Sequence, residues 1–161
     1  MDQKTQYLTQ YLIVLRHGET HPNVLAQQPT DKLHYEVTGS DQEIGLTSRG
    51  LAQIRETCVL FLVPFLREAR IQISRIDCSQ FKRTREAAQI LQETLPNKPP
   101  IVQDPRVAKR NYGEFWNITY RGVAELFPEE YDLFRTLGGF QYRPPGGENY
   151  LDLRNRLLEF R

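Results

Sequence analysis

Several residue types are scarce in this sequence, and each scarcity excludes a class of protein. Two cysteines occur among 161 residues, so this is not a secreted domain held together by disulfides, and we expect both thiols to be free and buried. The three histidines, His17, His21 and His34, lack the spacing of a metal site, so no metal ion is expected. Residues 1–10 are polar without a signal-peptide core, so we expect a loosely packed start and a cytoplasmic location.

An excess of charge and long apolar runs are absent as well. The 21 basic and 20 acidic residues give a net charge of +1, which argues against nucleic-acid and membrane-surface partners. The longest apolar run, residues 58–66, contains Pro64 and is too short to span a bilayer. A hydrophobic content of 39% therefore predicts one globular domain over residues 1–161 with a core of its own.

The most informative stretch runs from Tyr11 to Thr20. Its first five residues are apolar and rich in branched side chains, which predicts a strand buried on both faces within a parallel sheet. Arg16, His17 and Gly18 follow at the end of this strand, where open α/β sheets bind ligands. A neutral imidazole can attack phosphorus, and a guanidinium can hold phosphate oxygens. The stretch therefore predicts a phosphate site.

Two further polar residues favour this interpretation. Arg16 and His17 alone would favour the simpler interpretation of ordinary polar residues at a strand end. Thr20 adds a hydroxyl and Asn23 an amide, both close enough in sequence to surround the same anion. Residues 21–45 then show no periodicity, and we expect them to form a long loop over the site, because loops of this length in compact domains are usually functional.

Helical periodicity begins after this loop. Thr47 is a suitable N-cap, and Pro64 predicts a kink or break. Apolar residues at spacings of three and four predict one buried helix face, made of Leu51, Ile54, Cys58, Phe61, Phe65 and Ala69.

A second junction between a strand and a helix follows. Residues 73–78 predict a strand, and the helix after it continues to about Leu95, with Ala87, Ile90, Leu91 and Leu95 on one face. Residues 101–103 predict a short edge strand. Three cations at the helix start oppose the helix dipole and so need a reason: Lys82, Arg83 and Arg85. The remaining periodic segments predict helices near residues 120–127 and 131–137, the latter ended by glycines, and a last helix with Tyr150, Leu153 and Leu157 on its apolar face.

The stretch Leu-Arg-His-Gly-Glu-Thr-x-x-Asn resembles the signature of the histidine phosphatase superfamily, the group that contains cofactor-dependent phosphoglycerate mutase. Later segments agree with the family in the same order, including Leu-Thr-x-x-Gly at 46–50, Ser79 with Arg83 four residues later, and Pro-Gly-Gly-Glu at 145–148. The resemblance implies an α/β fold of three layers, with a mainly parallel sheet flanked by helices.

The resemblance also implies roles for individual residues. His17 would be the nucleophile that takes a phosphoryl group from the substrate and passes it to water or to a second hydroxyl. Arg16 and Arg83 would hold the phosphoryl oxygens, helped by Gly18, Thr20 and Asn23, whereas Lys82 and Arg85 would be surface residues. The family chemistry needs no metal and no other cofactor, and the implied partner is a small phosphorylated substrate.

The sequence departs from the family in two ways. Lys109 stands four residues before Gly113, where the family has its carboxylic proton donor, and Glu114 or Asp104 would have to replace that acid. No histidine follows His34, although the family has a second one on a later strand. We therefore expect a piece of a longer protein, incomplete at its C-terminal end; the alternative is a natural short form that has lost part of its site.

The expected function is that of a phosphatase acting on small phosphorylated metabolites through a phosphohistidine. A phosphoglycerate mutase is the first alternative, which the short chain disfavours, and a non-catalytic binder of phosphorylated ligands is the second. We expect Arg143, in a stiff loop, to lie at the rim and contact the non-reacting part of the substrate, although a solvated surface arginine fits equally well. The oligomeric state stays open, a homo-oligomer included.

Overall fold

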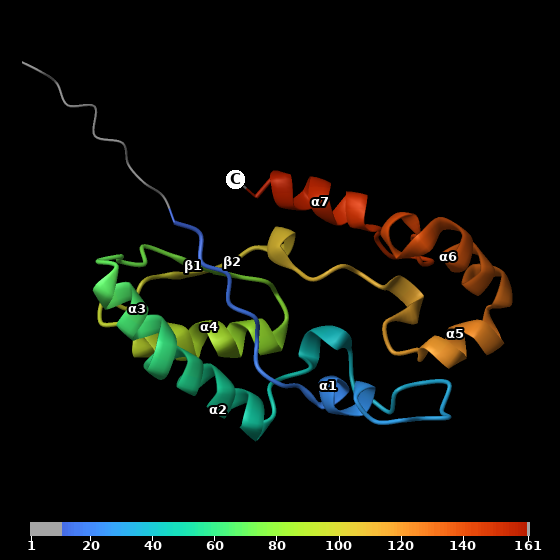
Figure 1. Cartoon of the computed structure of the whole chain (residues 1–161), viewed down its shortest axis with the longest axis horizontal. Coiled ribbons are helices and arrows are strands. Elements are labelled where there is room, and N and C mark those ends of the chain that lie inside the picture. The colour runs from blue at the N-terminus through green and yellow to red at the C-terminus, as the bar shows by residue number, and fades with distance from the viewer. Residues whose placement is uncertain (1–10, 161) are drawn as a thin grey trace, which may run out of the picture.

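The computed structural model describes residues 11–160, so the expected loose start over residues 1–10 lies outside the described residues. The sheet has two short parallel strands, β1 (Ile76–Cys78) and β2 (Ile101–Gln103), with Ile76 paired to Ile101. Figure 1 shows α2, α3 and α4 grouped beside these strands, whereas α5 and α6 form a second group farther along the molecule. The parallel pairing and the edge strand confirm the predicted α/β class.

Seven α-helices lie within residues 11–160: α1 (His21–Ala26), α2 (Ser48–Glu56), α3 (Val63–Glu68), α4 (Lys82–Thr94), α5 (Tyr120–Leu126), α6 (Pro128–Gln141) and α7 (Tyr150–Leu158). A π-helix, η2 (Thr57–Leu62), joins α2 to α3, and short 3₁₀ turns occur at η1 (Asp41–Glu43), η3 (Pro105–Val107) and η4 (Gly113–Phe115). The expected structureless loop over residues 21–45 therefore contains a short helix, α1, and the turn η1. None of the helices within residues 11–160 has the length and apolar character needed to cross a bilayer.

The predicted buried strand at residues 11–15 does not form. The segment passes beside the sheet in Figure 1 without any strand pairing among the described residues. Leu12 and Val14 are 84% and 85% exposed, whereas Ile13 and Leu15 pack against the two core clusters. A strand exists only through hydrogen bonds to its neighbours, which the apolar run could not specify. The expectation that this chain is a piece of a longer protein stays a prediction.

The helix after Thr47 begins as predicted, because the Thr47 hydroxyl accepts a hydrogen bond from Gly50 N at 3.0 Å. Pro64 lacks an N–H and its ring crowds the carbonyl four residues earlier, and the wide π turn η2 lies immediately before it. The wider turn shifts the apolar face, so the predicted burial of Phe61, Phe65 and Ala69 is wrong. Phe61 and Phe65 are 69% and 53% exposed, Ala69 is exposed as well, and Leu66 is buried instead.

The core lies between the sheet and these helices. One cluster surrounds Leu66, Ile76, Cys78, Ala88 and Leu95, and the other contains Ile54, Cys58, Ala87 and Ile90. These clusters confirm the predicted inner face of α4, and they also enclose both free cysteines, as expected. Each fully buried large apolar side chain contributes roughly 1.5–3 kcal/mol. All the buried residues of the two clusters come from residues 54–95, so this part of the domain supplies much of the apolar stabilisation.

The C-terminal helices depend more on aromatic and polar contacts. Tyr142 is buried, packs edge-on against Phe134 with ring centroids 5.5 Å apart, and donates its hydroxyl to Glu130 at 2.7 Å. The glycine stop in α6 is confirmed as a break at Gly138, whose φ is 73°. The predicted apolar face of α7 is less buried than expected, since Leu157 is 43% exposed and α7 has no buried residue.

A close backbone crossing fixes the Arg-His-Gly loop on the start of α2. A Cβ on Gly18 would lie 2.2 Å from Gly50 O, and a Cβ on Gly50 would lie 2.1 Å from Glu19 O. Thr47 N donates to Glu19 O at 2.9 Å, and Glu19 N donates to Gln53 Oε1 at 2.8 Å. The family-like Leu-Thr-x-x-Gly block thus has a structural role, which is to let the loop approach the helix.

We expect Gly50→Ala to destabilise the protein, because the added methyl group meets a backbone carbonyl that cannot rotate away. Urea unfolding should show a loss of at least about 1–3 kcal/mol, the range for overpacked sites. The matched control is Gly139→Ala, whose Cβ would meet only Phe134 Cε2 at 3.6 Å, an ordinary contact. Equal stability of the two variants would contradict the importance of the crossing.

Candidate active site

His17 is oriented by its own loop. Its Nδ1 lies 2.7 Å from Gly18 O, and because a carbonyl can only accept, Nδ1 must carry the proton. The neutral ring therefore keeps the lone pair on Nε2, where a nucleophile is needed. The structure thus provides the tautomer that attack on phosphorus requires.

Electrostatics keep this imidazole uncharged. Burial is the main cause that lowers the pKa of His17 below its ordinary value of about 6.5, and the charges of Arg83, Arg16 and Lys109 lower it further. The hydrogen bond to Gly18 opposes this trend by favouring the imidazolium. These three cations act on His17 from three separate segments. The structure thus brings two predicted phosphate-binding residues, Arg16 and Arg83, and the residue at the place of the family acid, Lys109, near the imidazole.

Thr20 and Asn23 bind each other beside the loop of His17. The Thr20 hydroxyl donates to Asn23 Oδ1 at 2.9 Å, and Thr20 N donates to the same oxygen at 3.1 Å. These bonds close a capping box at the start of α1, and Thr20 is only 2% exposed. Both residues lie beside the loop that carries His17, but the structure gives their side chains a capping role, and their contact with phosphate stays a prediction.

Arg83 is a buried cation with a carboxylate partner. It is 5% exposed, lies over the ring of Phe81 with its Cζ 4.3 Å from the ring centroid, and donates Nη1 to Asp41 O at 2.7 Å. The same nitrogen is 3.0 Å from Asp41 Oδ1. In contrast, Lys82 and Arg85 are exposed, as predicted. An isolated buried guanidinium would be costly, and Asp41 supplies the compensating charge.

Lys109 shares the carboxylate of Asp41. Its Nζ lies 2.7 Å from Asp41 Oδ2. Neither acid suggested as a replacement for the family donor reaches this place: Glu114 is exposed, and Asp104 pairs with Arg106, whose hydrogen bonds lower the pKa of Asp104 to about 2. Sequence reasoning missed Asp41, because nothing in the segment 27–45 marks one acid among several.

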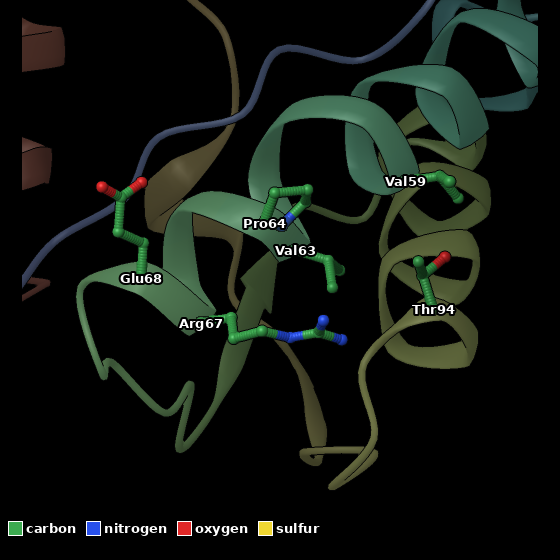
Figure 2. A pocket seen from close by; sticks show the side chains of 6 residues that line it. All are labelled: Val59, Val63, Pro64, Arg67, Glu68 and Thr94. Carbon is green, nitrogen blue, oxygen red and sulfur yellow. The ribbon is translucent and has the colours of Figure 1, made fainter.

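A cavity of about 450 Å³ adjoins this ion cluster. Its lining residues come from four separate segments: Ser40, Asp41, Gln42, Gln80, Phe81, Pro105, Ala108, Lys109, Asn111, Gly113, Trp116, Glu148 and Arg156. A second hollow of about 580 Å³ lies between η2, α3 and α4, where Figure 2 shows Val59, Val63 and Thr94. It contains none of the predicted site residues. The smaller cavity is lined by Lys109 and by Asp41, the partner of Arg83, whereas His17, Arg16 and Arg83 are not among its lining residues. The smaller cavity is therefore the candidate site for the part of a substrate that carries the phosphoryl group.

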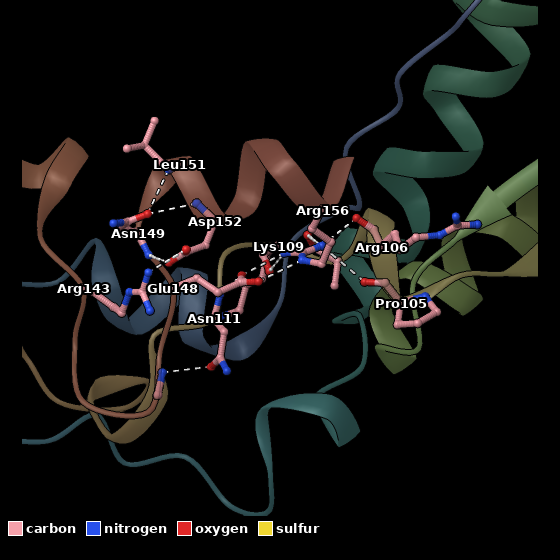
Figure 3. Close-up of polar contacts among 12 residues, drawn as sticks. Pro105, Arg106, Lys109, Asn111, Arg143, Glu148, Asn149, Leu151, Asp152 and Arg156 are labelled. Atoms are coloured by element: carbon pink, nitrogen blue, oxygen red, sulfur yellow. Dashed lines mark hydrogen bonds and ion pairs between the residues drawn. The ribbon is translucent and has the colours of Figure 1, made fainter. Parts of the chain in front are cut away.

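Arg156 of α7 holds the segment that carries Lys109. Its Nη1 donates to Arg106 O at 2.6 Å and to Ala108 O at 3.1 Å, and its Nε donates to Glu148 Oε1 at 2.8 Å (Figure 3). The pKa of Glu148 is lowered chiefly by this hydrogen bond from Arg156. The Pro-Gly-Gly-Glu block therefore anchors the cavity wall, a role that its sequence did not reveal.

Arg143 lies apart from the cavity wall. Its Nη2 is 2.7 Å from Asp152 Oδ1, and its side chain is 58% exposed. Arg143 is not among the residues that line the cavity, so its predicted contact with the substrate stays a prediction. Among residues 11–160, no three histidine, cysteine or acidic side chains gather in a way that could hold a metal ion.

Comparison with known proteins places this arrangement in a family. The sequence profile of the histidine phosphatase superfamily (branch 1) matches residues 12–161. Human 6-phosphofructo-2-kinase/fructose-2,6-bisphosphatase 3 is 31% identical over 146 residues, or 91% of this chain and 24% of that protein. The corresponding chicken protein is 30% identical over 142 residues, or 88% and 25%. The chain belongs to the histidine phosphatase superfamily and spans about a quarter of the length of these relatives.

Solved structures agree on the fold. The α-ribazole phosphatase of Shigella flexneri superimposes with a TM-score of 0.67 at 21% identity, covering 91% of this chain and 62% of that one. A mycobacterial glucosyl-3-phosphoglycerate phosphatase gives a TM-score of 0.63 at 20% identity, covering 89% and 61%. The fold is thus that of phosphoglycerate mutase-like phosphatases, as the sequence predicted.

We expect the imidazole of His17 to titrate below an ordinary histidine. Proton NMR of the folded chain should give a His17 midpoint lower than the histidine midpoint of the urea-denatured chain, because burial and three cations disfavour the charged ring. Arg83→Met should move the His17 midpoint upward, since it removes one of those cations. A midpoint that does not respond to Arg83→Met would show that Arg83 lies too far away to act on His17.

We expect Arg83→Ala to weaken the binding of inorganic phosphate or vanadate by at least about 1 kcal/mol, the low end for a hydrogen bond to a charged group. Arg85→Ala is the matched control, because it removes the same charge from the same helix turn at an exposed position. Calorimetric titration of both variants would test the assignment. If the two variants bind equally well, Arg83 does not belong to the anion site.

Proposed function

We propose that this chain is a phosphatase that removes the phosphoryl group of a small phosphorylated metabolite through a phosphohistidine at His17. The observation that carries the proposal is the bond between His17 Nδ1 and Gly18 O at 2.7 Å, which leaves Nε2 free in a cluster of cations. Family membership supports a phosphoryl substrate, and the fructose-2,6-bisphosphatase and α-ribazole phosphatase relatives support hydrolysis as the outcome.

The chemistry follows from the positions of the charges. His17 Nε2 attacks phosphorus, and the negative charge spread over the equatorial oxygens is stabilised by Arg16 and Arg83. These cations and Lys109 supply positive charge of the kind that metal ions provide in other phosphoryl-transfer sites, so we propose a metal-independent reaction without a cofactor. Water then attacks the phosphohistidine and regenerates the imidazole.

The proposal extends to the location, the partners and the oligomeric state of the protein. The two free, buried thiols fit a reducing compartment, so we propose a cytoplasmic enzyme. The near-neutral net charge of +1 disfavours nucleic acid and membrane surfaces as partners. The apolar side chains of Leu12 and Val14, 84% and 85% exposed, fit a homo-oligomer or a further segment that covers them.

One observation favours a second function. Lys109, which stands at the position of the family acid, pairs with Asp41. A non-catalytic binder of phosphorylated ligands would use the same cations without hydrolysing the ligand.

A phosphoglycerate mutase is the other alternative. It would form the same phosphohistidine but would pass the phosphoryl group to a second hydroxyl instead of water.

The test is to trap the phosphorylated histidine. The chain is mixed with ³²P-labelled p-nitrophenyl phosphate, quenched in alkali and digested, and we expect an acid-labile label on the peptide that contains His17 and none in His17→Asn. His21→Asn is the matched control, because it removes a neighbouring exposed histidine outside the proposed site. Binding of vanadate without any label would favour the non-catalytic binder, and transfer of the label to phosphoglycerate would favour the mutase.

A further inference from the structure

Asp41 lies between Arg83 and the cavity of about 450 Å³. Its Oδ1 is 3.0 Å from Arg83 Nη1, and its Oδ2 is 2.7 Å from Lys109 Nζ. Asp41 and Lys109 also line that cavity. If Arg83 holds the phosphoryl group, as the proposed function has it, and the rest of the substrate fills the cavity, the oxygen that joins the two lies near Asp41.

The cavity wall presents groups suited to a polar leaving group. Gln42 and Gln80 line it beside Asp41, and Gln80 Oε1 is buried without a hydrogen-bond partner among the described residues. Buried polar atoms are almost always paired, so this oxygen is free to accept from a bound hydroxyl. A substrate alcohol in the cavity would then place its bridging oxygen next to Asp41.

We propose that Asp41 is the proton donor to the leaving oxygen, in place of the carboxylic acid for which Lys109 is substituted. This assignment rests on the proposed function. Lys109 occupies the chain position of the family acid, yet it brings a carboxylate from η1 to within 2.7 Å of its ammonium. The proposed acid therefore comes from a different segment, η1. It is held by Lys109, the residue that stands at the chain position of the family acid.

Asp41 must leave its two ion pairs for this role, and the substrate provides the condition. Its carboxylate is shared by Arg83 and Lys109. A phosphoryl dianion draws these cations to its own oxygens, because it accepts charge-assisted hydrogen bonds as a carboxylate does. Binding of the substrate thus frees the Asp41 carboxyl group to act at the leaving oxygen.

The proposed reaction has two phosphoryl-transfer steps, and each conserves atoms, protons and electrons. The P–O bond to the leaving group breaks while a P–Nε2 bond to His17 forms; the electron pair goes to the leaving oxygen, which takes the proton of Asp41 and departs as the alcohol. In the second step the oxygen of water bonds to phosphorus, its proton returns to the Asp41 carboxylate, and the electron pair of the P–N bond returns to Nε2. Both His17 and Asp41 are regenerated.

Leaving-group dependence tests the assignment. In single turnovers with ³²P-labelled esters, we expect Asp41→Asn to slow phosphorylation of His17 by an alkyl phosphate about 10²-fold, the low end for general acid catalysis. Phosphorylation by p-nitrophenyl phosphate should change little, because its leaving group needs no proton. Glu43→Gln is the matched control, since it removes the same charge from the same turn but lies outside the cavity wall.

A double variant distinguishes the acid from a merely structural ion pair. Adding Lys109→Glu to Asp41→Asn places a carboxyl group at the family position, and we expect it to restore alkyl phosphate turnover relative to Asp41→Asn alone. An equal loss of rate for both esters in Asp41→Asn, or no recovery in the double variant, would overturn the assignment while leaving phosphohistidine chemistry intact. Absence of any label on His17 in the unaltered chain would overturn the proposed function and this assignment together.

Discussion

The backbone crossing between Gly18–Glu19 and Gly50 is the constraint on which the site depends. Residues 11–19 make no strand pairing among the described residues, and the only bridge of the loop within the described residues joins Thr20 to Leu46, so its position is set by contacts with the start of α2 and the segment just before it. Two residues without side chains allow the approach, and Thr47 both caps α2 and donates to Glu19. Movement of this crossing would displace the imidazole and its neighbour Arg16 as one unit.

The rest of the site is assembled by polar contacts from distant segments. Arg156 on α7 binds the carbonyls of the segment before Lys109, and Asp41 joins that segment to Arg83 on α4. Such bonds are individually modest, but they are directional and therefore fix the cavity wall more closely than apolar packing would. This explains how α7 contributes to the site although none of its residues is buried.

Charge balance connects the structure to the proposed chemistry. Arg16, Arg83 and Lys109 all oppose protonation of His17, and Asp41 offsets two of these cations. Under the proposed function, a phosphoryl dianion takes over the contacts that Asp41 makes, because both are anions that accept charge-assisted hydrogen bonds. The ion cluster thus compensates the charge of a buried guanidinium.

The sequence determined the family, the α/β class, the cap at Thr47, the inner face of α4 and the cations at the end of β1, because each depends on local spacing or on a motif that is contiguous in the chain. Two predictions from the sequence were wrong. Residues 11–15 form no strand, because a strand needs hydrogen-bonded neighbours that the apolar run does not specify. The apolar face of the helix was displaced near Pro64, because one π turn rotates the side chains within and after it, which exposes Phe61 and buries Leu66. Only the tertiary structure could bring Asp41, Lys109 and Arg156 to one cavity, because ion pairs between segments far apart in the chain leave no periodic signal.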